Sequence, residues 1–305
     1  MNGLTERAEN MGKPVTVSSK ELKAFLDASK RNTRLMGHIE RHLLAKPFDD
    51  RDQTHLHPSD IIKPEWCLLA SYHALRGNYV ETRDKTPLRL ASVFEEGHFI
   101  HAKWQAWIRE MGNLHGTWYC DECDHKFIAT SPVECPQCKF GQYISYREVP
   151  LSSPKHMISG HADGWVKGLG EDFAIEIKSI GTGTLRWEAP GILAQADGDL
   201  EKAWRNIRQP FRTHQLQGQV YLHLMHLMVE EGKLESAPEE IVFIYELKAN
   251  QDYKEFTVKY NPEFTADIFE KALDLVWAVD NNRPPLCNID SVKGCKRCAP
   301  FQEEK

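Results

Sequence analysis

Residues 173 to 180 read Phe173-Ala174-Ile175-Glu176-Ile177-Lys178-Ser179-Ile180. Apolar residues alternate with Ala174, Glu176 and Lys178, and this period of two predicts a β-strand. Side chains two positions apart in a strand project from the same face. The pattern therefore predicts a strand with one hydrophobic face and a second face that presents the Glu176 carboxylate beside the Lys178 amine.

Two further stretches supply a histidine and a second carboxylate. Gly97-His98-Phe99-Ile100-His101 falls within a predicted helix, and Gly160-His161-Ala162-Asp163 falls within a predicted strand. Hard divalent cations prefer oxygen ligands, so Asp163 and Glu176 are candidate ligands of Mg²⁺ or Mn²⁺. His101 would be a further ligand of the same ion, delivered from the helix.

These residue types match the needs of phosphodiester hydrolysis. A bound metal would polarise the scissile phosphate and lower the pKa of a bound water, while Lys178 would orient that water and offset charge in the transition state. His101, Asp163, Glu176 and Lys178 therefore predict metal-dependent cleavage of a phosphodiester. Each residue alone also fits a plainer interpretation, because an isolated Glu-x-Lys is usually a solvated surface pair and a histidine on an apolar helical stripe is usually a core residue.

Composition sets the class of protein. The chain has 305 residues, 41% of them hydrophobic and 27% charged, which predicts a soluble globular protein with a substantial core. It contains no apolar run of the roughly 18 residues that a membrane span needs and no N-terminal secretory signal, so we expect a cytoplasmic protein without a membrane partner. The net charge of -6 excludes a uniformly basic nucleic-acid-binding surface, but metal-binding carboxylates make a site acidic until the ion binds.

The order of elements predicts an α/β fold. Residues 1–56 are expected to form a polar, partly helical arm, and residues 57–300 the core, with an inserted module over 116–146 and a cysteine-bearing tail over 283–305 that packs on the core. Other predicted elements are strands over 157–166, 241–247 and 255–260, and helices over 92–104, 193–207, 213–231 and 264–279.

Eight cysteines fall into two groups. Cys120-x-x-Cys123 and Cys135-x-x-Cys138 form two close pairs flanked by aromatic residues, a spacing typical of a tetrahedral structural Zn²⁺ site. A closed four-thiolate site has no position for substrate, so we expect this zinc ribbon to contribute to folding and to contact DNA rather than to catalyse. The alternative is four free cysteines. Without an export signal, cysteine clusters indicate metal rather than disulfides.

The order of these stretches resembles the PD-(D/E)XK nucleases, and specifically their RecB-like branch. The resemblance rests on Gly97 with His101, then Asp163, then Glu176 with Lys178, and finally Gln217 with Tyr221 on a later predicted helix. It implies a restriction-endonuclease-like core, a mixed central sheet flanked by helices, that cleaves DNA. It further implies that the backbone carbonyl of Ile177 binds the metal and that Gln217 and Tyr221 brace the site or touch the DNA. Ala162 departs from the proline of the motif's name.

The remaining cysteines, Cys67, Cys287, Cys295 and Cys298, extend the resemblance. One early cysteine with three late ones is similar to the iron-sulfur members of this branch, the nucleases associated with CRISPR adaptation, in which a [4Fe-4S] cluster joins the two ends of the chain. Here the close pair Cys295-x-x-Cys298 comes last, whereas those relatives place it before a longer gap. A Zn²⁺ ion on the same ligands, or free thiols at Cys67 and Cys287, remain alternatives.

The sequence thus predicts a Mg²⁺- or Mn²⁺-dependent DNA nuclease, similar to phage exonucleases, that acts in recombination, repair or replication-linked processing. We expect an exonuclease because only the zinc ribbon could read sequence. The chain lacks a nucleotide-binding Gly-x-x-x-x-Gly-Lys-Ser/Thr motif, so a helicase partner would have to separate strands. Two alternatives are a non-catalytic nucleic-acid-binding scaffold that uses the zinc ribbon, and a hydrolase of small phosphoesters.

Overall fold

The structure, a computed structural model, describes residues 34–47, 51–82, 84–290 and 295–301. Most of the expected arm over 1–56 lies outside the described residues, as does part of the tail over 283–305. The described chain divides into a small unit, residues 34–47 and 84–92, and a large unit formed by the rest. The small unit holds α2 (Met36–Ala45), and α5 (Leu88–Glu110) begins in it.

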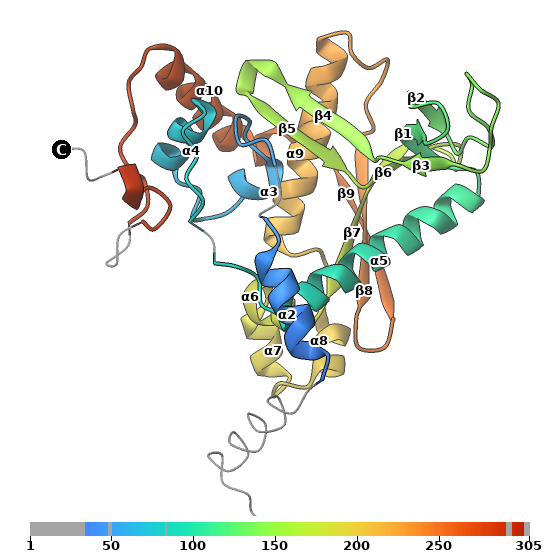
Figure 1. Cartoon of the computed structure of the whole chain (residues 1–305), viewed down its shortest axis with the longest axis horizontal. Coiled ribbons are helices and arrows are strands. Elements are labelled where there is room, and N and C mark those ends of the chain that lie inside the picture. Colours follow the sequence, from blue (N-terminus) through green and yellow to red (C-terminus); the bar gives the residue numbers. More distant parts are fainter. Residues whose placement is uncertain (1–33, 48–50, 83, 291–294, 302–305) are drawn as a thin grey trace, which may run out of the picture. The chain divides into compact units, whose positions relative to one another are not determined.

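In the described part of the chain, a mixed sheet of seven strands forms the centre of the large unit (Figure 1). The order is β2 (His125–Thr130), β1 (Leu114–Cys120), β6 (Gly164–Val166), β7 (Phe173–Ile180), β8 (Glu240–Leu247) and β9 (Tyr253–Lys259), and β3 (Ile144–Tyr146) also pairs with β1. Strands β7 and β8 run parallel, and the other pairs run antiparallel. The predicted α/β class with a mixed central sheet is confirmed.

The cysteine-bearing segment over 116–146 belongs to this sheet. Strand β1 pairs with β6 through Leu114 opposite Val166, and both side chains are buried. Trp118 of β1 is fully buried in the same cluster as Ile175 of β7. The segment therefore extends the central sheet, whereas the sequence had indicated a module outside the core.

The strand predicted over 157–166 is two strands in two different sheets. Strand β5 (Ile158–Ala162) pairs with β4 (Val149–Ser153) in a separate two-stranded sheet, whereas β6 pairs with β7 in the central sheet. The prediction of one continuous strand is wrong because the chain changes partner at Asp163. That residue is left between the two ladders.

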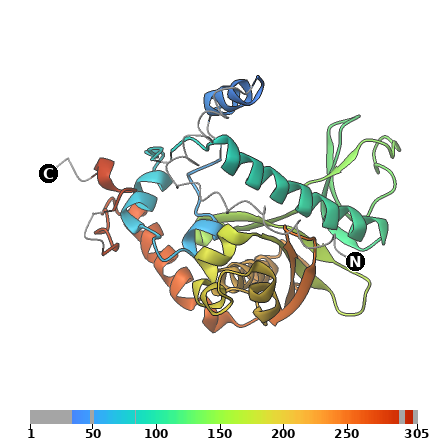
Figure 2. The same ribbon diagram turned by 90° about the horizontal axis from the view of Figure 1, so that it is seen from below.

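Helices cover both faces of β7. Ile175 and Ile177 pack in one cluster with Ile100 and Ile108 of α5. Ala174 and Ile180, on the other face, belong to the cluster of α9 (Arg212–Glu230) and α10 (Ala266–Asp280). Figure 2 shows α5, coloured teal, on one side of the strands. The alternating side chains of β7 thus project from two faces that are both covered by helices.

The helix predicted over 193–207 is interrupted. It consists of α7 (Pro190–Gln195) and α8 (Leu200–Asn206), because Asp197 and Gly198 adopt positive φ values of 55° and 80°. Left-handed residues end a helix, and Asp199 then caps α8 by accepting a hydrogen bond from the Lys202 amide. The predicted strands over 241–247 and 255–260 and helices over 213–231 and 264–279 are confirmed as β8, β9, α9 and α10.

The short elements are α3 (Pro58–Ile61), α4 (Leu68–Leu75), α6 (Thr182–Glu188) and the 3₁₀ turns η1 (Pro154–His156), η2 (Pro262–Phe264) and η3 (Ala299–Phe301). Among the described residues, no helix is both long and apolar enough to cross a membrane.

Candidate active site

The candidate site lies where β7 continues past the end of β6. The ladder between the two strands ends at Gly164 opposite Ile175, so β6 does not pair with the last residues of β7. Asp163 directly precedes β6, and its Oδ2 accepts a 2.6 Å hydrogen bond from the backbone N–H of Ile177. The Asp163 carboxylate thus accepts the backbone hydrogen bond that a neighbouring strand would otherwise accept, and this bond holds the carboxylate beside Glu176.

His101 reaches the same place from α5. Its Nδ1 lies 3.2 Å from Asp163 Oδ1. One turn earlier, Gly97 faces β7 so closely that an added Cβ would lie 3.2 Å from Ser179 Oγ, so a glycine favours the approach of the helix. Burial alone would lower the pKa of His101, but the hydrogen bond and negative charge of Asp163, together with Glu176, raise it overall. Asp163 therefore favours the protonated form of His101.

Glu176 is a buried carboxylate with one satisfied oxygen. Its Oε1 lies 2.6 Å from Lys178 Nζ, and the residue is 2% exposed. Burial and the nearby Asp163 raise its pKa to about 7, although Lys178 and His101 oppose the shift. Within the residues that the structure describes, Oε2 has no hydrogen-bond partner. A buried carboxylate oxygen without a partner is costly, and a cation would offset that cost.

Helix α9 holds the lysine from the other side. Lys178 Nζ donates a 2.8 Å hydrogen bond to Gln217 Oε1, and Gln217 Nε2 donates a 2.6 Å bond to the hydroxyl of Tyr221. Gly218 lets this helix pack on β8, because an added Cβ would lie 2.6 Å from the Phe243 ring. The structure thus brings together all six side chains expected at the site.

The site contains two further residues that the sequence analysis did not identify. Gln105, one turn after His101 on α5, donates a 2.9 Å hydrogen bond to the backbone oxygen of Asp163. Glu148 lies near the same carboxylate, since burial and the charge of Asp163 raise its pKa to about 7. Helical spacing from His101 could have identified Gln105. No local pattern marks Glu148, which precedes β4 with a φ of 61°.

These groups have the chemistry of a divalent-cation site but are more loosely arranged than the cysteines. Among the described residues, the metal-capable groups whose ligand atoms all lie within 4.8 Å of one another are the two cysteine sets. In the candidate site, Asp163 pairs with His101 while Glu176 pairs with Lys178. His101 therefore holds one carboxylate in position, and Lys178 holds the other.

The first cysteine set has the dimensions of a single tetrahedral ion. Cys120 Sγ lies 3.5 Å from Cys138 Sγ, and Cys123 Sγ lies 3.7 Å from Cys135 Sγ. A Zn–S distance of 2.3 Å in a tetrahedron separates the sulfurs by about 3.8 Å. The four thiols therefore fit Zn²⁺ as they stand.

The second set joins α4 to the tail. Cys67, which caps α4 through its sulfur, lies 3.9 Å from Cys287 across 220 positions of sequence, and both belong to the set with Cys295 and Cys298. Asn288 strengthens the junction by accepting from the Leu68 amide and donating to a backbone oxygen of the early segment. The spacing fits one ion directly, while a four-iron cluster requires the thiolates to move apart.

The buried Glu176 makes a specific prediction for stability without added Mg²⁺ or Mn²⁺. Its pKa is about 7 when folded and 4.5 in its ordinary state, so this group costs nothing below about pH 4.5 and destabilises the protein increasingly as pH rises from 4.5 to 7, above which the cost stays constant. At pH 8 the cost is about 3 kcal/mol. We expect Glu176→Gln to melt higher than the wild type at pH 8 and equally at pH 4.5 in thermal unfolding. A difference that does not depend on pH would contradict the prediction.

No protein-family model matches the sequence, and no curated protein matches it. Among solved structures, the crystal structure of an alkaline exonuclease (LHK-Exo) from Laribacter hongkongensis is similar at 10% identity and a TM-score of 0.42, over 76% of this chain and 91% of that chain. The complex of LHK-Exo with dAMP covers the same shares at 11% identity and a TM-score of 0.41. The crystal structure of SSO0001 matches at 12% identity and a TM-score of 0.34, over 90% of this chain and 93% of that chain. Similarities this weak assign no activity to this chain.

Proposed function

We propose that this protein is a divalent-metal-dependent DNA nuclease. The observation that carries the proposal is the buried Glu176, whose second oxygen lacks a partner among the described residues beside a second carboxylate and a lysine. If Glu176 and Lys178 formed only a structural ion pair, Asp163 and His101 would not be needed beside them. A scaffold without catalytic activity would gain nothing from two close carboxylates that raise each other's cost.

The residues present fit a Mg²⁺ or Mn²⁺ ion. Asp163, Glu176 and His101 would hold it, with the carbonyl of Ile177 as a fourth ligand. In an extended strand the N–H and C=O of one residue point to the same edge, and the N–H of Ile177 points to Asp163. When bound, the metal polarises the phosphate and lowers the pKa of a bound water.

The protein's own groups then position the reactants. Lys178, held by Gln217, would orient the attacking water and offset the negative charge that develops on the phosphate. Gln105 would hold the backbone at Asp163 and so keep one metal ligand in place. Glu148, with its raised pKa, would accept the proton that the attacking water loses.

The substrate and the family are parts of the same proposal. The order of His101, Asp163, Glu176, Lys178, Gln217 and Tyr221 supports membership of the RecB-like PD-(D/E)XK nucleases, which implies DNA. We further propose an exonuclease that acts in recombination, repair or replication-linked processing, with a helicase or similar partner to separate strands.

The cysteine sets would stabilise this nuclease. We propose a zinc ribbon at Cys120, Cys123, Cys135 and Cys138, where the sulfur separations match one tetrahedral ion. The second set would join the early helix to the tail through either Zn²⁺ or a [4Fe-4S] cluster, as in the iron-sulfur branch. A Zn²⁺ ion and a [4Fe-4S] cluster can each be bound by four thiolates, and elemental analysis for zinc and iron distinguishes them.

The test is a cleavage assay with linear and circular DNA, single- and double-stranded, with Mg²⁺, Mn²⁺ or neither. We expect metal-dependent loss of linear DNA in the wild type and none with Asp163→Asn. A preference for linear over circular DNA would identify an exonuclease. DNA binding without cleavage under every condition would contradict the proposal and favour a nucleic-acid-binding scaffold, and cleavage of model phosphodiesters alone would favour a small-molecule hydrolase.

Replacing Gln217 with leucine is expected to lower the turnover rate by about 10- to 100-fold with little change in KM, because the variant loses the side chain that positions Lys178. Steady-state cleavage kinetics measure this. Gln219→Leu is the matched control: it is a buried glutamine of the same helix whose hydrogen bonds go to the backbones of Lys259 and Asn261. It should lower stability and leave turnover unchanged. Equal turnover losses in both variants would remove the positioning role.

A further inference from the structure

The structure contains a cavity of about 270 Å³ that shares no lining residue with the candidate active site. Its wall comes from the segment over 51–82 and from two residues of the tail, Arg297 and Phe301. No side chain assigned above to metal binding at the candidate active site takes part, although Cys67 of the second cysteine set does. The cavity therefore calls for its own explanation.

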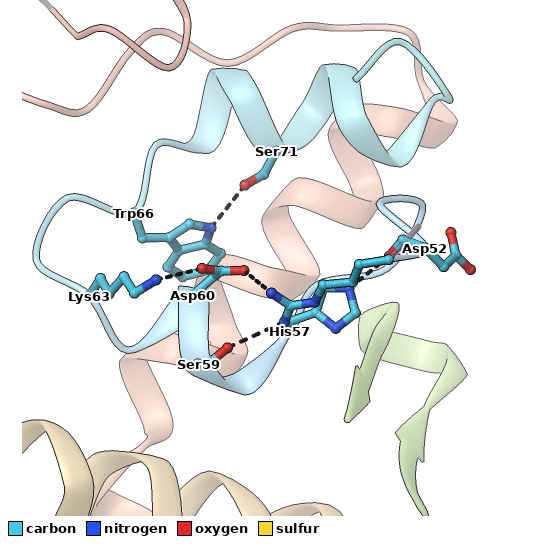
Figure 3. Close-up of polar contacts among 8 residues, drawn as sticks. Asp52, His57, Ser59, Asp60, Lys63, Trp66 and Ser71 are labelled. Atoms are coloured by element: carbon cyan, nitrogen blue, oxygen red, sulfur yellow. Dashed lines mark hydrogen bonds and ion pairs between the residues drawn. The ribbon is translucent and has the colours of Figure 1, made fainter. Parts of the chain in front are cut away.

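Three cations, Arg51, Lys63 and Arg297, line the cavity around one carboxylate, that of Asp60. Asp60 Oδ2 accepts from Arg51 at 3.0 Å and Oδ1 accepts from Lys63 at 2.7 Å, and Arg51 also donates to Ser59 at 3.3 Å (Figure 3). Arg297 is close enough to help these two cations lower the pKa of Asp60. Three cations around one carboxylate leave two positive charges in excess, in a chain whose net charge is -6.

Apolar and aromatic residues form another part of the lining, which also contains polar side chains such as Gln53, His57 and Thr82. The apolar and aromatic residues include Leu56, Ile61 and Leu75, which are buried, and Tyr79, which is 41% exposed. Trp66 donates from Nε1 to Ser71, so its ring is held in a fixed position at the wall. Cations together with apolar and aromatic side chains in one cavity match a ligand that has one anionic group and one flat ring.

We propose that this cavity binds a nucleotide, with the phosphate on Arg51, Lys63 and Arg297 and the base against the apolar wall at Tyr79. Arginine and lysine are suited to phosphate oxygens, and aromatic rings accept any base by stacking. The volume is just below the range of about 300–1,000 Å³ that is usual for drug-sized ligands, so one nucleotide is the upper limit. The ligand is either a free mononucleotide or the phosphorylated terminal nucleotide of a DNA strand.

Calorimetric titration without added divalent metal tests the proposal on the full chain. The probes are inorganic phosphate, a deoxynucleoside 5′-monophosphate, the corresponding nucleoside, and a short oligonucleotide with or without a 5′-phosphate. We expect the monophosphate to bind at least about tenfold more tightly than the nucleoside. Tighter binding of the phosphorylated oligonucleotide than of the monophosphate assigns the DNA end, and equal or weaker binding assigns the free nucleotide. A nucleoside that binds as well as its monophosphate would overturn the proposal.

Variants locate the site. Arg51→Gln and Lys63→Gln should each weaken monophosphate binding by about tenfold. Asp60→Asn should strengthen it, because the substitution removes the only carboxylate among the lining residues. A folding defect cannot mimic that gain. The matched control is Lys202→Gln, which also removes one positive charge and one exposed ion pair, with Asp197, and should change nothing. Unchanged binding in all three cavity variants would overturn the proposal and place the phosphate elsewhere.

Discussion

Replacing Lys178 with alanine is expected to reduce the rate of metal-dependent DNA cleavage by roughly 100- to 1,000-fold, the cost of removing one preorganised charge from a developing anion. Lys178 makes 2.6 and 2.8 Å contacts with Glu176 and Gln217, so its amine is held in one place before substrate binds. The variant also leaves Glu176 buried without its cation, which raises the pKa of that carboxylate further and weakens metal binding. Rates at saturating Mn²⁺ separate the two effects.

The chain contains a second buried lysine–glutamate pair that serves as the control. Lys103 Nζ lies 2.5 Å from an oxygen of Glu246, which is 1% exposed. Lys103→Ala removes the same charge from an equally buried carboxylate, which keeps a hydrogen bond from Trp104 Nε1, so the loss of stability should be no larger than in Lys178→Ala. Cleavage should stay within about threefold of wild type at a temperature where both variants are folded, since Lys103 touches none of the proposed catalytic groups. Equal losses of activity in the two variants would mean that Lys178 acts only through stability.

Replacing Cys298 with serine is expected to remove the metal of the second cysteine set and to lower the Tm strongly. Metal binding to four thiolates contributes on the order of 10 kcal/mol to folding of small zinc domains. Loss of only ~4 kcal/mol of that contribution would lower the Tm of a chain of this size by roughly 10 °C. Elemental analysis and the visible spectrum of anaerobically purified protein measure the metal, and thermal unfolding measures the Tm.

The first cysteine set provides the control for this experiment. Cys123→Ser should remove one equivalent of zinc and leave the second set intact, because the two sets share no residue. Iron with visible absorbance that Cys298→Ser alone removes would identify a cluster, and two zinc equivalents in colourless wild-type protein would identify single ions. Wild-type protein without metal at Cys67, Cys287, Cys295 and Cys298, and with an equally stable variant, would contradict both assignments.

Local patterns predicted the elements that have strong periodicity. The alternation in β7 and the long apolar spacing of α9 depend on which faces are buried, so they can be read without knowing the partners. The grouping of His101, Asp163 and Glu176 had no such local basis. It rested on the metal chemistry of these residue types and on a resemblance to a family, and the contacts that produce it cross to β7 from α5 and from the residue before β6.

Features decided by tertiary contacts were missed. The break at Asp163 arises because β5 pairs with β4 whereas β6 pairs with β7. No residue type within 157–166 indicates this change of partner. The break between α7 and α8 could have been anticipated from Gly198, a residue that readily adopts positive φ. Glu148 joins the site only because its turn lies against Asp163, so its role required the fold.

The position of Asp163 has a mechanical consequence. This residue joins the β4–β5 ribbon to β6 of the central sheet, as Arg147 and Glu148 join the other end of the ribbon to β3, and the side chain of Asp163 is hydrogen-bonded to β7. A small slide of the ribbon past the sheet would move Asp163 and Glu148 together and would change the separation of both carboxylates from Glu176 on β7. Force on the ribbon, from DNA or from a partner protein, would then be converted into a change in metal affinity.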